Sequence, residues 1–284
     1  MSATVGPVVA DLTTATLLAP LLFLSLFVCL RAAAAEAEVK PRRPVALAVC
    51  GDQLVVATRD AGSLIVVDIA ARRVVSEAIV GRRISHVAAG FSPGELFAVD
   101  ESSHQLLRLK LARESAEDSA KLTVVERATV AKYPVALAVD VARRRLAVSG
   151  LWSRRVTMFE CEASGENAGD SATTRLRPVA SIDVPFAPRH CLFLPDGRLV
   201  VADAFGGGLA VIDGDRRCVT WAARVQGHNL GGLALSLDRR QVLISQQTLS
   251  GSETTTEDPV FWGQLLNNSL RTVSLDELPR DESS

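Results

Sequence analysis

The chain has 284 residues, of which 48% are hydrophobic, 22% charged and 5% aromatic. Its 19 glycines and 12 prolines are close to the usual background, which excludes a collagen-like or low-complexity chain. With 31 Lys and Arg against 32 Asp and Glu, the formal charge is −1. No net field attracts nucleic acid or an anionic lipid surface, so we expect no nucleic-acid partner.

The N-terminal residues contain an apolar segment that is set apart from the fold. Residues 17–30 read LLAPLLFLSLFVCL, which is short for a membrane span of about 20 residues and suits a signal-peptide core. Small residues follow, with possible cleavage sites after Ala35 or Ala37. However, no Lys or Arg precedes the apolar run and Arg31 follows it, and this charge distribution favours the membrane orientation opposite to that of an export signal. Residues 1–37 are predicted to be a cleaved signal peptide or an uncleaved membrane anchor. We therefore expect an exported, periplasmic protein that contacts a membrane only if the anchor is not cleaved. The third alternative is a cytoplasmic protein with an atypical N-terminal tail.

A repeat of about 40–50 residues organises residues 38–278. Its five units begin near residues 44, 84, 134, 188 and 231. Each unit opens with an apolar run, continues through a turn into a second run, and the first four units add a third and a fourth run. Turn sequences such as Gly51-Asp52 and Asp196-Gly197 suit hairpins. The pattern predicts an all-β protein, a β-propeller of four-stranded antiparallel blades with about five recognisable repeats.

The fifth unit is incomplete. It offers runs at 231–235 and 241–245 and a third at 269–273, and no fourth run precedes the polar tail at 279–284. Residues 36–43 could supply the missing strand and close a five-bladed ring. An open propeller would instead expose strand edges, where self-association is expected. In a third interpretation the chain is the front portion of a longer protein.

Two stretches resemble a known repeat family. Residues 51–75 read GDQLVVATRDAGSLIVVDIAARRVV and residues 196–219 read DGRLVVADAFGGGLAVIDGDRRCV. Both are similar to the YVTN-type β-propeller repeat, and the resemblance covers about residues 42–246. Residues 258–278, DPVFWGQLLNNSLRTVSLDEL, resemble a segment of large exported bacterial proteins that join such a propeller to c-type cytochrome modules. This chain carries no C-x-x-C-H haem attachment motif. It therefore differs from those proteins in the part that carries their redox function.

Motifs that carry chemistry are sparse. Cys50, Cys161, Cys191 and Cys218 show no C-x-x-C spacing and are interpreted as small buried hydrophobes or as two disulfides. Residues 90–94 match the hydrolase pattern G-x-S-x-G, but a strand-like run follows Ser92 where an elbow needs a helix. We therefore predict no catalytic residue, no bound metal and no cofactor, and the three tryptophans are isolated and predict no stacking platform.

The segments that lead into the first strands carry the one convergent feature. In a propeller these segments lie at one rim of the central channel, and each unit places a basic or imidazole group there. The candidate ligand-binding residues are Arg43, Arg83, His86, Tyr133, Arg189, His190 and His228. Such a ring could hold an anion, or a metal ion through the three histidines. Solvated loop residues without a ligand are the plain alternative.

Function is predicted as an exported, non-catalytic propeller that scaffolds or binds a protein partner. One alternative, implied by the resemblance of residues 258–278, is a redox accessory that docks a c-type cytochrome or a dehydrogenase. A second alternative is a propeller enzyme of the lactonase or quinoprotein kind, although no acidic cluster accompanies the four histidines. Fold alone decides none of these.

Overall fold

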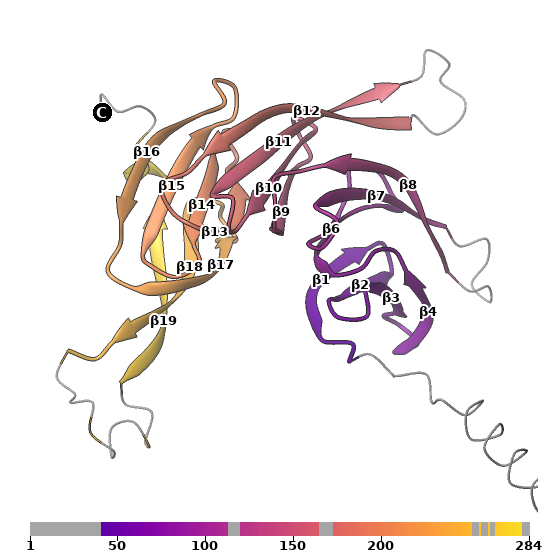
Figure 1. Ribbon diagram of the computed structural model, residues 1–284, viewed down its shortest axis with the longest axis horizontal. Helices are drawn as coiled ribbons and strands as arrows, with labels where there is room; N and C mark the ends of the chain where they lie inside the picture. The colour runs from indigo at the N-terminus through magenta and orange to yellow at the C-terminus, as the bar shows by residue number, and fades with distance from the viewer. Residues whose placement is uncertain are drawn as a thin grey trace, which may run out of the picture. The chain divides into compact units, whose positions relative to one another are not determined.

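The computed structural model describes residues 41–112, 120–164, 173–251, 256, 261 and 265–279. Arg42–Ser284 forms one compact unit, and its described elements are 19 strands and a 3-10 turn, Leu275–Glu277. The strands form five antiparallel sheets in which neighbours in the sheet are also neighbours in the chain. This arrangement is the predicted β-propeller, whose blades follow one another from indigo to yellow in Figure 1.

Four blades have four strands each. Blade 1 consists of β1 (Pro44–Cys50), β2 (Gln53–Thr58), β3 (Ser63–Asp68) and β4 (Arg73–Ile79). Blade 2 consists of β5 (Ile84–Ala89), β6 (Glu95–Asp100), β7 (Gln105–Ala112) and β8 (Lys121–Thr129). Blade 3 consists of β9 (Pro134–Asp140), β10 (Arg145–Gly150), β11 (Arg155–Ser164) and β12 (Thr173–Asp183). Blade 4 consists of β13 (Pro188–Phe193), β14 (Leu199–Asp203), β15 (Gly208–Asp213) and β16 (Cys218–Arg224).

In the described part of the chain blade 5 has three strands, in line with the runs predicted for the fifth unit. Its described strands are β17 (His228–Leu235), β18 (Gln241–Leu249) and β19 (Leu266–Ser274). The predicted closing strand at residues 36–43 lies mostly outside the described residues, and residues 41–43 are not in a strand. The signal peptide or anchor at 1–37 lies wholly outside them, as do the tail beyond residue 279 and Trp262. In the described part of the chain no helix has the length and apolarity needed to span a membrane.

The blades share local irregularities that identify them as copies of one unit. The pairing of the first two strands shifts register near the start of the inner strand in every blade, for example between Ile84 and His86 and between Pro188 and His190. In blades 1 to 4 a second shift occurs where the third strand pairs with the fourth. Such bulges increase strand twist. Among the described hairpins β11–β12 has the longest strands, of 10 and 11 residues.

The hydrophobic core lies between the blades. Four clusters of buried side chains join blades 1 and 2, 2 and 3, 3 and 4, and 4 and 5. Central strands such as β6 and β14 are buried on both faces, because a blade packs on each side of them. Among the described residues no such cluster joins blade 5 to blade 1. Blades 1 and 5 therefore each keep one uncovered face.

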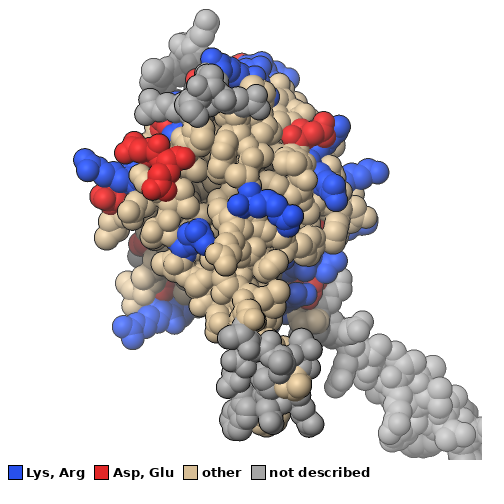
Figure 2. Space-filling model, turned by 90° about the vertical axis from the view of Figure 1, so that its left-hand side faces the viewer, with Lys and Arg blue, Asp and Glu red and all other residues tan. Residues whose placement is uncertain are grey.

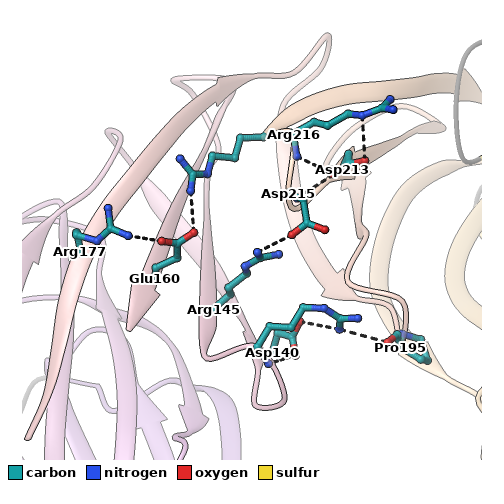
Figure 3. A network of polar contacts seen from close by, with 10 residues as sticks. Asp140, Arg145, Glu160, Arg177, Pro195, Asp213, Asp215 and Arg216 are labelled. Atoms are coloured by element: carbon teal, nitrogen blue, oxygen red, sulfur yellow. Dashed lines mark hydrogen bonds and ion pairs between the residues drawn. The ribbon is translucent and has the colours of Figure 1, made fainter. Parts of the chain in front are cut away.

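Polar contacts cross from β10 and β11 of blade 3 to the β15–β16 turn of blade 4 (Figure 3). Arg145 of blade 3 forms an ion pair with Asp215 of blade 4, with 2.6 Å between Nη2 and Oδ1. Glu160 of blade 3 binds Arg177 of its own blade and Arg217 of blade 4, the latter at 2.7 Å. Asp213 accepts the amides of Asp215 and Arg216, both at 2.8 Å, as aspartate side chains commonly do in turns.

The C-terminal described residues fold back onto blade 4. Arg198 of this blade donates to the carbonyl oxygens of Leu278 at 2.7 Å and Pro279 at 3.1 Å, and it pairs with Asp196. Leu278 is buried in the core between blades 4 and 5. This tether holds the segment after β19 against the propeller.

Candidate functional site

The residues that lead into the inner strands share a repeated backbone feature. In four blades the carbonyl oxygen of the residue before the inner strand accepts the amide of the residue that follows the second strand. The accepting residues are Arg43, Arg83, Tyr133 and Ala187, and the donors are Arg59, Glu101, Leu151 and Ala204. These lead-in residues therefore occupy equivalent backbone positions in the four blades. Their side chains, however, enter different environments.

Arg43 and Arg83 begin neighbouring blades but differ in their partners. Arg43 is exposed and has a left-handed backbone with φ 44°. Arg83 approaches two carboxylates, with its Nε 3.8 Å from Glu101 and 4.0 Å from Asp60. Glu101 also binds Arg59 of blade 1. Arg83 thus belongs to an ionic cluster between blades 1 and 2, which reduces the positive charge it offers to a ligand.

Tyr133 packs against a histidine that the rim prediction did not include. Its amide donates to His104 Nδ1 at 3.3 Å, and the two rings meet edge to face with centroids 5.4 Å apart. The Tyr133 side chain remains exposed. It is an accessible ring at the rim beside blade 2.

His86 and His190 occupy the same bulged position in the inner strands of blades 2 and 4. Burial, together with the nearby His190, lowers the pKa of His86 to about 4. Burial, with the charge of Arg189, also lowers the pKa of His190. Both imidazoles are therefore neutral near pH 7 and offer lone pairs rather than positive charge. His86 Nδ1 is buried with no hydrogen-bond partner among the described residues.

Arg189 and His228 have different surroundings from that pair. Arg189 donates to Asn229 Oδ1 at 2.6 Å, and Asn229 in turn donates to Gln247 at 3.1 Å, which ties blade 4 to blade 5. His228 is exposed at the start of β17. Across the described ranges no group of three or more His, Cys, Asp or Glu side chains is placed to hold a metal ion. The seven predicted residues therefore form several local contacts rather than one ring of free charges.

Two sequence interpretations outside the rim have clear outcomes. Ser92 lies in a tight hairpin between β5 and β6, where Glu95 N donates to its carbonyl oxygen at 3.0 Å. Cys50, Cys161, Cys191 and Cys218 are all free thiols. Burial raises the pKa of Cys161 and of Cys191 to about 12, so both thiols stay protonated at neutral pH.

Sequence reasoning missed an aromatic pair at the rim. Trp152 was predicted to be isolated, and this is wrong: its ring stacks on Phe205 with centroids 5.3 Å apart. Both residues lie two positions after the end of a second strand, in blades 3 and 4. The same repeat alignment that placed the lead-in residues could have found them. Both rings are more than half exposed, at 61% and 52%.

A pocket lies beside this aromatic pair. It has a volume of about 520 Å³ and is lined by Arg154, Phe186, Asp203, Phe205, Gly206 and Arg224, among others. Figure 2 shows basic and acidic residues interspersed among uncharged ones on one face of the molecule. The pocket is therefore distinguished by its shape and its aromatic lining.

The structure is similar to solved propellers. A chain of Kuenenia stuttgartiensis hydrazine synthase matches with a TM-score of 0.66 and 17% identity, over 85% of this chain and 66% of that one. A protein from Lactobacillus plantarum matches with 0.56 and 16%, over 84% and 73%. The β-propeller domain of Cps50 from Myceliophteria thermophila matches with 0.53 and 11%, over 83% and 73%. At these identities the likeness shows the fold alone, and this chain spans about two thirds of the hydrazine synthase chain.

No protein-family model and no curated protein matches the sequence. The YVTN-type repeat and the relation to cytochrome-bearing proteins therefore stay predictions from the residues quoted above.

Proposed function

We propose that this chain is an exported, non-catalytic assembly module, in which the uncovered face of blade 1 packs against blade 5 of a second copy. The carrying observation is a hexapeptide that occurs twice. The sequence PVALAV forms residues 44–49 in β1 and residues 134–139 in β9. Leu137 is 4% exposed, whereas Leu47 is 63% exposed. One sequence thus has a covered and an uncovered copy.

Blade 2 shows what covers this hexapeptide. Its Phe97 and Leu106 belong to the same core cluster as Leu137, with Ala88 packed against them. Ala88 pairs with Phe97 across β5 and β6, so these residues present one apolar sheet face. The surface that fits β1 is therefore the face that a blade turns toward the next blade in the chain.

Blade 5 carries a comparable face at the same register positions. Ala234 pairs with Leu243 as Ala88 pairs with Phe97, and Ser245 pairs with Leu270 as Val99 pairs with Leu106. Leu270 is 65% exposed. One chain thus holds both halves of a further blade-to-blade contact. Because the two faces differ, copies would join head to tail, closing into a ring or extending.

Sedimentation velocity of the full chain over a wide concentration range tests this proposal. We expect an assembly larger than one chain that Leu47→Asp and Leu270→Asp each reduce to monomers, because a buried carboxylate in an apolar contact is strongly unfavourable. Leu237→Asp is the matched control, since Leu237 is fully exposed in the turn between β17 and β18. A wild-type protein that is monomeric throughout, or a control that dissociates equally, overturns the proposal.

A monomeric outcome would favour the alternatives. The redox accessory is supported by the resemblance of residues 258–278 and predicts that the monomer binds a c-type cytochrome through the same β1 face. The enzyme alternative predicts turnover by the purified chain that Leu47→Asp does not alter.

A further inference from the structure

The pocket between blades 3 and 4 is independent of the blade 1 face and is built like a small-molecule site. The turn from β14 to β15 and the lead-in to β13 form two of its walls, and Arg154 contributes from the β10–β11 turn. Its volume of about 520 Å³ falls within the range of about 300–1,000 Å³ that is usual for ligand pockets.

Glycines open this pocket. A Cβ atom on Gly208 would lie 2.5 Å from the Phe186 ring, so a larger residue there would displace the aromatic wall. A Cβ atom on Gly206 would lie 2.7 Å from Asp203 Oδ2 and 3.2 Å from Arg224 Nη2. Glycine at position 206 therefore leaves a gap between a carboxylate and a guanidinium. No ion pair within 4.0 Å joins these two side chains in the described structure.

The polar groups at the gap retain unused hydrogen-bonding capacity. Asp203 uses Oδ1 to accept the Phe205 amide at 3.1 Å, and no described residue binds its Oδ2. The equivalent Asp100 of blade 2 uses both oxygens, on the amides of Arg82 and Arg83. Within the described ranges the guanidinium groups of Arg154 and Arg224 form no ion pair with a carboxylate and no hydrogen bond to an amide oxygen. Arg145 and Arg198, by contrast, pair with Asp215 and Asp196.

The remaining walls are aromatic. Phe186 and Phe205 line the pocket, and Trp152 supports the far side of the Phe205 ring. Exposed aromatic side chains that gather at a pocket mark binding sites more often than single exposed apolar residues do. A flat ring can stack on these phenyl groups in an offset or edge-on arrangement.

We infer that this pocket binds a small aromatic carboxylate that carries a hydrogen-bond donor on its ring. The ligand carboxylate accepts from the guanidinium groups of Arg154 and Arg224, whose forked donors suit two oxygens. The ring packs between Phe186 and Phe205. The hydroxyl or amino group of the ligand donates to Asp203 Oδ2.

Calorimetric titration of the full chain with benzoate, 4-hydroxybenzoate, 4-aminobenzoate and indole-3-acetate tests this assignment, with Trp152 fluorescence as a second readout. We expect the ring-donor compounds to bind more tightly than benzoate. The double variant Arg154→Gln/Arg224→Gln should weaken every compound at least tenfold, because charge-assisted hydrogen bonds contribute more than neutral ones.

Two further variants separate the roles of the lining residues. Asp203→Asn should reduce the preference for 4-hydroxybenzoate over benzoate while leaving benzoate affinity unchanged within about threefold. Arg72→Gln is the matched charge control, since Arg72 is exposed in the β3–β4 turn of blade 1. If none of the four compounds binds, or if the double variant binds as the wild type does, the assignment is wrong. Leu47→Asp should leave binding unchanged, which separates this site from the assembly face.

Discussion

Asp100 shows how a single carboxylate holds the turn at the end of a blade's second strand. Its Oδ2 accepts the amide of Arg82 at 2.9 Å, and its Oδ1 accepts those of Arg83 and Ser102 at 3.2 and 3.1 Å. Burial pushes the pKa of Asp100 up, but the hydrogen bonds from Ser103, Arg82 and Arg83 together outweigh it and hold the pKa below its ordinary value of 3.8. A depressed pKa contributes stability above the unfolded-state pKa, and that stability is lost as the pH falls through the folded-state pKa.

Asp100→Asn should therefore lower the free energy of unfolding by about 1–3 kcal/mol at pH 7, because backbone amides lose a charged acceptor. The difference from the wild type should begin to narrow as the pH falls below about 4, where the carboxyl of the unfolded chain is protonated, and should close as the pH falls through the lowered folded-state pKa. Urea unfolding followed by fluorescence at several pH values measures both effects. Asp203→Asn is the control and should cost less, since Asp203 accepts one amide, that of Phe205. An equal cost at both sites would contradict this reasoning.

Alanine substitutions at Gly51 and Gly62 distinguish the cost of backbone strain from the cost of a steric collision. Both lie in hairpin turns of blade 1 with left-handed backbones, at φ 66° and 63°. A Cβ atom on Gly51 would meet nothing within 4 Å, whereas one on Gly62 would collide with the Gly81 carbonyl oxygen. Gly51→Ala should cost about 1 kcal/mol from backbone strain. Gly62→Ala should cost about 1–3 kcal/mol more, because the backbone must move. Thermal unfolding of both variants measures the difference, and equal melting temperatures would show that the collision is relieved.

The two copies of the hexapeptide PVALAV allow the energetic effect of burial to be measured in two strands of the same sequence. Leu137 in β9 and Leu47 in β1 have identical neighbours in sequence and pair with equivalent residues, Val148 and Val56. Leu137→Ala should cost about 2–5 kcal/mol, the usual range for a buried leucine. Leu47→Ala should cost less than about 1 kcal/mol in the monomer, where the side chain is mostly exposed. Urea unfolding of both variants in dilute solution measures the contrast. Comparable losses would mean that β1 is covered in the monomer.

The same hexapeptide shows where reading the sequence succeeds and where it stops. Alternating apolar runs and turn residues repeat in every unit, so strand existence, order and the incomplete fifth blade could be predicted from local pattern. Local pattern is identical for β1 and β9, so it cannot tell a covered strand from an uncovered one. That difference arises from which blade packs on it.

In the candidate site, too, sequence repeats predict backbone positions but not the partners of the side chains. The lead-in residues of four blades make equivalent backbone hydrogen bonds, because backbone geometry repeats with the sequence. Some partners of their side chains come from neighbouring blades: Asp60 of blade 1 lies 4.0 Å from Arg83, and Asn229 of blade 5 binds Arg189. The pocket beside Phe205 likewise depends on three turns distant in the chain. Such contacts depend on tertiary packing, which sequence spacing does not encode.

At the scale of the whole molecule, the propeller behaves as a linear array with two ends. Four core clusters join five consecutive blades, so blades 2, 3 and 4 have two neighbours and the end blades have one each among the described residues. In such an array, stability is close to a sum of blade terms and nearest-neighbour interface terms. Blade 1 lacks one interface term, so its local opening should require less free energy than that of blade 3.

Hydrogen exchange can measure this difference without a mutation. The amides of Leu47, Ala48 and Val49 have the same sequence neighbours as those of Leu137, Ala138 and Val139, so their intrinsic exchange rates match. Both strands are inner strands paired on one side only, with β2 and with β10. We expect at least tenfold lower protection in β1 for the monomeric protein, a difference of about 1.4 kcal/mol in opening free energy. Leu47→Asp provides the control, since it keeps the protein monomeric and should leave β9 protection unchanged. Equal protection in the two strands would mean that blade 5 or another segment covers β1 within one chain, which would also remove the basis for assembly through that face.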